Sequence, residues 1–302
     1  MTESPKSALR PLLSVLFALI TLFSGFVVIG QVTGMIGGFL FYDGTFLEWV
    51  DEFSHSLVLS EKLRLPLLIM QLCATGFGLI LTPWLYLRFI EKQPPAELFR
   101  IPGAIVAAVT GLAVLAFMIP DSVIIEWNSN ITLPGNLDAM VRESEELAAA
   151  VTKFLTRFNG FPDFLLGFLV IAILPAVGEE LAFRGMLQPA LQRLTGNGHV
   201  AIWVTAIIFS AFHFQFLGFV PRMMLGAMFG YMMYWSGNLW IPIIAHFVNN
   251  GASVILIYLH QLGVTDFDAE SAEAAPWSLV IPGAALFAAL LYVLRKQLTA
   301  VR

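Results

Sequence analysis

Residues 163–185 read DFLLGFLVIAILPAVGEELAFRG, an apolar stretch that leads into two adjacent carboxylates and an arginine. Its apolar part, 163–182, has the length of about 20 residues that a helix needs to cross a bilayer. Ionisable side chains within a membrane span are costly, so Glu179, Glu180 and Arg184 are functional candidates from the outset. This stretch predicts a membrane helix that carries groups with a chemical role.

The rest of the chain repeats the apolar pattern. Further runs that could span a membrane lie at 11–33, 65–89, 101–119, 200–220, 222–236, 239–260 and 277–295, of which 222–236 is short. Of the 302 residues 58% are hydrophobic and 12% are charged, whereas soluble domains contain about 25% charged residues. This composition excludes a soluble enzyme, a disordered protein and a coiled coil. We therefore predict an all-α fold, a polytopic transmembrane helical bundle with about eight spans.

Charged residues outside these runs predict how the chain is oriented. The basic ones gather near the termini and in alternate connections, at Lys6, Arg10, Arg88, Lys92, Arg100, Arg193, Arg295, Lys296 and Arg302. The other connections are acidic, at 43–52, 143–146 and 266–273. Since loops rich in Lys and Arg stay in the cytoplasm, we expect a multi-pass protein of the plasma (inner) membrane with both termini cytoplasmic. Arg222 and the mixed stretch 142–157 depart from this pattern.

The connection between Pro120 and Pro162 is long for a helical bundle. Its 143–157 part has apolar residues at helical spacing, which fits either a helix on the outer membrane surface or a solvated loop helix. With 16 basic and 21 acidic residues in the whole chain, no basic excess indicates a nucleic-acid partner.

Polar groups concentrate in three of the predicted spans. Glu180 and Arg184 lie one helical turn apart and can pair on one face, whereas Glu179 points about 100° away and has no partner on its own helix. His213 lies in an aromatic run, and His246 and Asn250 share a face of the span 239–260. Taken singly, these groups could be a buried ion pair, a packing histidine and an interhelical hydrogen bond. Turned inward together, they predict a polar cavity that suits water, a peptide bond or an ion.

Three motifs carry a family resemblance. Glu179-Glu180-Leu-Ala-Phe-Arg184, Phe209-Ser-Ala-Phe-His213 and His246-Phe-Val-Asn249-Asn250 follow each other on successive helical segments. In this order they resemble the motifs of the CPBP family of intramembrane proteases, which includes the type II CAAX prenyl endopeptidases. The resemblance covers about residues 160–255. It suggests N-terminal helices and an outer loop without a motif at 1–160, catalytic helices at 161–260 and a last span at 261–302, all within one structural unit.

The resemblance also implies roles for the matched residues. Glu179 would be the general base that activates water with the help of His213. His246 and Asn250 would stabilise the oxyanion, and Glu180 and Arg184 would hold the first carboxylate in place. A zinc-dependent version stays open, because two histidines and one glutamate are a legitimate set of catalytic zinc ligands. In that version Glu179, His213 and His246 bind the metal and Glu180 is the base.

The function expected from these residues is an intramembrane endopeptidase that hydrolyses a peptide bond near the cytoplasmic membrane face. Its partners would be membrane lipid and a peptide or membrane-protein substrate, with no cofactor unless zinc is bound. Two alternatives from other classes are a catalytically inactive immunity or binding membrane protein and a proton-coupled transporter.

Overall fold

A computed structural model describes residues 5–55 and 60–300, and within these ranges every regular element is a helix. The α-helices are α1 (Pro5–Phe23), α2 (Gln31–Leu40), α3 (Phe46–His55), α4 (Arg64–Cys73), α5 (Thr82–Leu85), α6 (Ala104–Ser129), α7 (Asn136–Leu155), α8 (Phe161–Phe168), α9 (Leu174–Glu180), α10 (Gln188–Thr195), α11 (Gly198–Ala211), α12 (Phe219–Ser236), α13 (Trp240–Gln261) and α14 (Trp277–Ala300). π-Helical segments join several of them into longer rods, at Ser24–Gly30, Ala74–Leu81, Tyr86–Ile90, Leu169–Ile173 and Leu181–Leu187. Short 3₁₀ turns lie at Glu61–Leu63 and Pro95–Leu98. The predicted all-α class is confirmed.

Six continuous helical rods in the described ranges are long and apolar enough to cross a membrane. They are Leu9–Leu40, Glu61–Ile90, Ala104–Ser129, Phe161–Thr195, Trp240–Gln261 and Trp277–Ala300. The remaining two predicted spans, 200–220 and 222–236, correspond to the shorter helices α11 and α12. The prediction of about eight spans therefore agrees with six long rods and two short helices.

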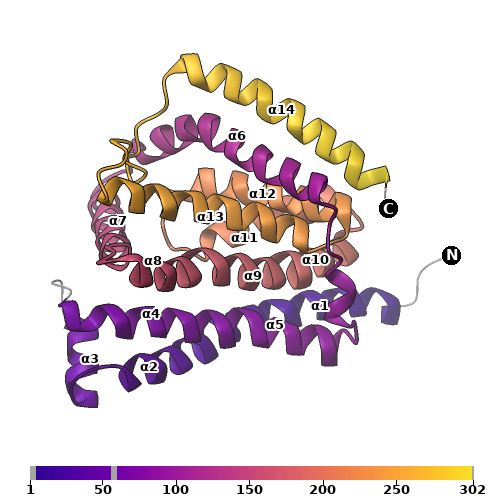
Figure 1. Ribbon diagram of the computed structural model, residues 1–302. Helices are drawn as coiled ribbons and strands as arrows, with labels where there is room; N and C mark the ends of the chain where they lie inside the picture. The colour runs from indigo at the N-terminus through magenta and orange to yellow at the C-terminus, as the bar shows by residue number, and fades with distance from the viewer. Residues whose placement is uncertain (1–4, 56–59, 301–302) are drawn as a thin grey trace.

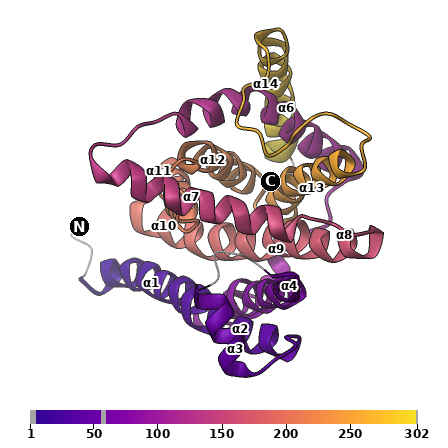
Figure 2. The same ribbon diagram turned by 90° about the vertical axis from the view of Figure 1, so that its left-hand side faces the viewer.

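The rods run side by side, with α7 placed across one end of the bundle (Figure 1). The rods containing α1, α2, α4 and α5 form one layer, α8–α13 lie above it, and α6 and α14 form the opposite edge. Figure 2 shows α7 crossing in front of the ends of the rods. The N- and C-terminal ends both lie at the other end of the bundle, away from α7 (Figure 1).

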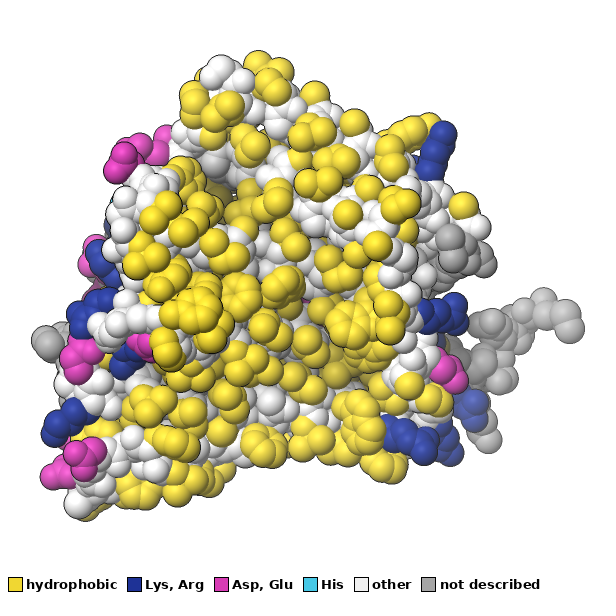
Figure 3. Space-filling model, viewed as in Figure 1, with side chains coloured by type: hydrophobic (Ala, Val, Ile, Leu, Met, Phe, Trp, Pro, Cys, Tyr) yellow, Lys and Arg dark blue, Asp and Glu magenta, His cyan; other side chains and the backbone are white. Residues whose placement is uncertain are grey.

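The surface of the bundle matches its sequence composition. Figure 3 shows a broad apolar band across the middle of the molecule, with charged side chains at its two ends. Large apolar residues on the rods are widely exposed, among them Phe89 at 65% and Ile105 at 71%. Soluble proteins do not expose apolar surface on this scale, and the long apolar rods identify a multi-pass membrane protein.

Small residues let the first two rods approach closely. A Cβ atom added to Gly25 would lie 2.6 Å from the carbonyl oxygen of Gly78, and one added to Gly78 would lie 2.6 Å from the carbonyl oxygen of Gly25. Close backbone contact of this kind is how helices pack in lipid, where burial of apolar side chains supplies no driving force. The pairing positions the layer against which α9 packs.

Several boundaries differ from the sequence prediction. The span predicted at 163–182 continues to Thr195, and the one predicted at 200–220 ends as α11 at Ala211, so His213 lies beyond it. The third predicted span was 101–119, whereas α6 continues through Pro120 to Ser129. The helix predicted at 143–157 begins earlier, at Asn136, and ends at Leu155. Pro120 does not end α6, because in a membrane helix neighbouring groups can compensate for the hydrogen bond that a proline removes.

The α7 end of the bundle is fastened by a buried arginine. Arg64 donates from Nη1 to Asp163 Oδ1 and Oδ2 at 2.5 and 2.6 Å. It also donates to the carbonyl oxygens of Phe154 and Leu155, at 3.3 and 3.2 Å. These bonds join α4, the end of α7 and the start of α8, and so hold α7 across the end of the bundle.

Candidate active site

The rod Phe161–Thr195 changes its helical geometry at the two adjacent carboxylates. Helix α9 ends at Glu180, and a π-helical segment, Leu181–Leu187, follows directly. Such wider turns within α-helices are rare and occur frequently at functional sites. Glu180 has no exposed surface, whereas the side chain of Glu179 is 17% exposed. The two neighbours thus face different surroundings, as the helical periodicity predicts.

Glu180 and Arg184 form the predicted pair within the core. Arg184 donates from Nη1 to Glu180 Oε1 at 2.7 Å, and neither side chain has exposed surface. Arg184 also donates from Nη2 to the carbonyl oxygen of Gly226 on α12, at 2.8 Å. Its guanidinium lies 4.6 Å from the ring centre of Phe209 and 5.5 Å from that of Phe229. The pair therefore joins the carboxylate-bearing rod to α11 and α12.

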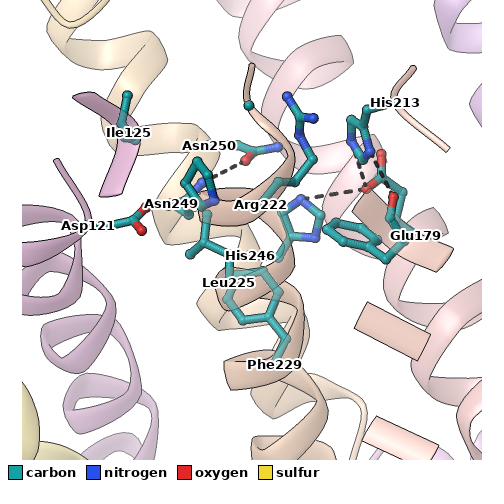
Figure 4. A pocket seen from close by; sticks show the side chains of 13 residues that line it. Asp121, Ile125, Glu179, His213, Arg222, Leu225, Phe229, His246, Asn249 and Asn250 are labelled. Carbon is teal, nitrogen blue, oxygen red and sulfur yellow. Dashed lines mark hydrogen bonds and ion pairs between the residues drawn. The ribbon is translucent and has the colours of Figure 1, made fainter. Parts of the chain in front are cut away.

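His246 on α13 is held by the same carboxylate. Its Nδ1 lies 2.8 Å from Glu180 Oε1, and its ring stacks on Phe229 with 5.3 Å between ring centres. Because a carboxylate accepts hydrogen bonds, Nδ1 is the donor. The other ring nitrogen, Nε2, faces Glu179 and lies 3.9 Å from its Oε2. Figure 4 shows His246 between Phe229 and Glu179.

His213 approaches Glu179 from another side. It lies two residues after the end of α11, and its Nδ1 is 2.9 Å from the carbonyl oxygen of Phe209. A carbonyl oxygen only accepts, so Nδ1 carries the proton. Nε2 then lies 4.0 Å from Glu179 Oε2. Phe214 follows with a φ of +55°, a conformation rare for bulky residues that turns the chain immediately after this histidine.

Three acceptor atoms therefore converge at Glu179. In the described part of the chain, Glu179 Oε2 is buried without a hydrogen-bond partner, and the two facing nitrogens carry lone pairs when their rings are neutral. Distances of 3.9 and 4.0 Å exceed the range of about 2.7–3.2 Å for a direct hydrogen bond. Because all three atoms are hydrogen-bond acceptors, a donor must lie between them, and a water molecule or a proton can fill that role.

Asn250 lies in the same cavity but is engaged elsewhere. Its Nδ2 donates to the carbonyl oxygen of Ile171 at 3.3 Å, and its Oδ1 accepts from Asn249 Nδ2 at 3.2 Å. One amide hydrogen of Asn250 has no partner in these bonds. The structure thus gathers Glu179, His213, His246 and Asn250 around one cavity and keeps Glu180 and Arg184 behind its wall.

Two cavities meet at the catalytic candidates. A polar cavity of about 330 Å³ is lined by Asp121, Ile125, Glu179, Phe209, His213, Gly218, Pro221, Arg222, Leu225, Phe229, His246, Asn249 and Asn250. A more apolar one of about 520 Å³ is lined by Phe26, Gln71, Leu79, Leu147, Ala148, Val151, Thr152, Glu179, Phe183, Phe212, His213, Phe214 and Gln215. Glu179 and His213 belong to both walls, so this pair separates the two cavities.

Three polar residues of the first cavity were not expected from the sequence. The predicted span 101–119 leaves Asp121 in the connection that follows it. Arg222 was noted only as an exception to the charge pattern, and Asn249 only as a neighbour of Asn250. For Asp121 the sequence contains an indication, because the apolar periodicity continues after Pro120 and so places this residue inside a span.

The zinc alternative finds no support in the arrangement of these side chains. Within residues 5–55 and 60–300, no group of three or more His, Cys, Asp or Glu side chains is positioned to hold a metal ion. Glu179, His213 and His246 converge, with Glu179 Oε2 4.0 Å from His213 Nε2 and 3.9 Å from His246 Nε2, a wider spacing than the roughly 3.4 Å between ligand atoms that each lie about 2.0–2.1 Å from one tetrahedral zinc. We therefore derive no step through zinc.

The cavities lie toward the α7 end of the bundle. Residues of α7 line the apolar cavity, and Glu145 of α7 accepts a hydrogen bond from the backbone N–H of Leu217, at 2.8 Å, in the segment after His213. Both chain ends lie at the opposite end (Figure 1). The cavities therefore lie away from the end of the bundle that holds both chain ends. Cytoplasmic termini and cleavage near the cytoplasmic face, both predicted from the sequence, cannot hold together in this arrangement.

Comparison with known proteins agrees with the resemblance. Residues 161–252 match the family described as type II CAAX prenyl endopeptidase Rce1-like. The chain is also 33% identical over 84 residues to the uncharacterized protein YpbD of Bacillus subtilis (strain 168). That alignment spans 26% of this chain and 40% of the relative's length. No solved structure matches the chain. The predicted resemblance is confirmed over 161–252, which supports activity of the intramembrane-protease type at the level of the family.

Proposed function

We propose that this protein is an intramembrane endopeptidase that hydrolyses a peptide bond with a water molecule activated by Glu179 and His213. The observation that carries the proposal is the convergence of Glu179 Oε2 with the Nε2 atoms of His213 and His246 at 4.0 and 3.9 Å. These groups come from α9, from α13 and from the turn that follows α11, and they meet beside a cavity, an arrangement with a cost in the membrane and no evident structural benefit.

In the first step a water molecule in the cavity donates its hydrogens to the Glu179 carboxylate and to His213 Nε2. Glu179 takes one proton while the water oxygen attacks the peptide carbonyl carbon, and the carbonyl π electrons move to its oxygen. A positioned base of this kind contributes about 10²- to 10⁴-fold in rate. His213 remains fixed through its bond from Nδ1 to the Phe209 carbonyl.

The oxyanion of the tetrahedral intermediate must be stabilised by hydrogen-bond donors. The free amide hydrogen of Asn250 is one, and His246 in its protonated form is a second, because Nδ1 remains bonded to Glu180 while Nε2–H points into the cavity. Each such donor is worth about 10²- to 10³-fold in rate. Collapse of the intermediate breaks the C–N bond, and the proton on Glu179 passes to the leaving amine.

The two cavities support cleavage within a chain rather than at its end. Since Glu179 and His213 line both, a peptide with its scissile bond at Glu179 has space on each side. We further propose that the protein resides in the plasma membrane with cytoplasmic termini. The reaction would then occur in the half of the bilayer that faces α7, on the outer side.

Purified protein in detergent, incubated with an internally quenched peptide library, tests the activity. We expect Glu179→Ala and His213→Ala to abolish cleavage. Glu143→Gln, on the exposed face of α7, and His260→Ala, at the exposed end of α13, are matched controls that retain it. Unchanged cleavage in both active-site variants would overturn the proposal. An inactive binding protein would cleave nothing in any form, and a transporter would instead move protons across liposomes.

A further inference from the structure

The wall of the polar cavity that lies across from Glu179 carries a carboxylate that the proposed reaction does not use. Asp121 of α6 is 4% exposed, its Oδ1 is buried without a hydrogen-bond partner, and among the described residues no ion pair joins it to a basic side chain. Figure 4 shows Asp121 and Ile125 on one side of the cavity and Glu179 with His213 on the other. An unpaired buried carboxylate is costly while it is ionised, so a cation that pairs with it would stabilise its charged form.

The other charges of the cavity do not compensate for Asp121. Arg222 lines the same cavity, but its Nη2 donates to Gln215 Oε1 at 2.8 Å, and no ion pair joins it to Asp121 in the described ranges. Glu179 and Asp121 contribute two negative charges and Arg222 one positive charge. With neutral histidines the cavity has one negative charge in excess. A proton on His246 would lie between Glu179 and Glu180 and leave Asp121 without a counter-charge, so a cation bound at Asp121 would neutralise it.

The position of Asp121 is well defined. Two helical turns further along α6, Asn128 donates from Nδ2 to the carbonyl oxygen of Phe216 at 3.2 Å and accepts from the backbone N–H of Val220 at 2.7 Å. These bonds fasten the same face of α6 to the start of α12. Next to Asp121, Ser122 Oγ accepts from the backbone N–H of Ala275 at 3.0 Å. The carboxylate is therefore held at the cavity from a rigid helix.

We propose that Asp121 binds a lysine or arginine side chain of the substrate and so determines specificity near the scissile bond. This inference rests on the proposed function, because it takes the ligand to be a peptide that reacts at Glu179. In a peptide, the side chains that supply a permanent positive charge are those of Lys and Arg. The stems of both can lie along the apolar residues Ile125 and Leu225 while the charged end meets Asp121.

The test is a set of internally quenched peptides that carry Lys or its uncharged analogue norleucine at each of three positions on either side of the cleaved bond. We expect the wild-type protein to prefer Lys at one position by about tenfold or more in kcat/KM, as for a hydrogen bond to a charged partner. Asp121→Asn, which keeps the shape of the side chain, should slow cleavage of the Lys peptide and bring the ratio of kcat/KM for the Lys and norleucine peptides to about one. Glu126→Gln, an acid-to-amide change on the exposed face of α6, should retain the preference.

Two outcomes overturn the inference. Either the wild-type protein shows no preference for Lys at any position, or Asp121→Asn lowers cleavage of both peptides equally, as a purely structural role predicts. Direct binding of both peptides to His213→Ala, measured by fluorescence anisotropy, separates this inference from the proposed function. Binding that favours Lys without any wild-type cleavage would contradict the proposed activity alone, whereas cleavage without a Lys preference would contradict the role of Asp121 alone.

Discussion

Nδ1 of His246 lies 2.8 Å from Oε1 of Glu180, a carboxylate with no exposed surface. The two residues are 66 positions apart in the chain. The same oxygen accepts a hydrogen bond from Arg184. Glu180 therefore neutralises a buried guanidinium and at the same time orients the histidine that faces Glu179. The two adjacent carboxylates have separate tasks, one in positioning and one at the cavity.

Glu180→Gln should destabilise the fold strongly. The substitution keeps the shape of the side chain but leaves the buried Arg184 without its counter-charge, and breaking such a pair costs about 3–5 kcal/mol. Thermal unfolding in detergent, followed by circular dichroism, measures the effect. The double variant Glu180→Gln with Arg184→Met should recover stability, since it removes the isolated charge; no recovery would contradict the electrostatic explanation.

Glu179→Gln should instead lower the activity without lowering the stability. We expect kcat to fall by about 10²- to 10⁴-fold through loss of the base, with stability unchanged or higher because Glu179 Oε2 is buried without a partner. Initial rates and unfolding temperatures of the same preparations provide both readouts. A loss of stability comparable to that of Glu180→Gln would place Glu179 in the structural network and remove it from the reaction.

Chelators should leave the activity unchanged. The mechanism proposed here assigns water activation to Glu179 and His213, and no group of three ligand side chains in the described ranges is arranged to hold a metal ion. Activity is measured after dialysis against 1,10-phenanthroline, with its non-chelating isomer 1,7-phenanthroline as the control. Loss of activity with the first compound only, and its return on addition of zinc, would show that a metal takes part.

Gly25→Ala should weaken the packing of the first two rods. The new Cβ atom would lie 2.6 Å from the carbonyl oxygen of Gly78, and overpacking of this kind costs about 1–3 kcal/mol. Gly76→Ala is the matched control, because a Cβ atom there meets nothing within 4 Å. Both variants are compared by thermal unfolding. Equal stabilities would show that the close backbone contact has no energetic role.

The orientation can be tested by labelling single cysteines in intact cells. In a background in which the free Cys73 is replaced by alanine, Ser144→Cys on the exposed face of α7 should react with a membrane-impermeant maleimide. Ala96→Cys, at the same end of the bundle as the chain termini, should react only after permeabilisation. The reverse pattern would place the α7 end in the cytoplasm and with it the reaction.

Features that depend on local geometry and composition could be predicted from the sequence. The apolar runs determined the helical bundle, because backbone groups in lipid must be paired within the helix. The spacing of Glu180 and Arg184 determined their ion pair, since residues four apart lie on one face of a helix. The same helical periodicity predicts that the side chains of Glu179 and Glu180 project from different faces of the helix.

Which distant groups share a cavity became clear from the three-dimensional packing of the rods. The contact of Glu180 with His246, the position of Glu179 between two cavities and the entry of Asp121 into one of them depend on how the rods pack. Their packing is set by steric contacts such as that of Gly25 with Gly78 and by hydrogen bonds such as that of Asn128 with Phe216. These interactions join residues far apart in the chain, and no periodic pattern along the sequence encodes their partners.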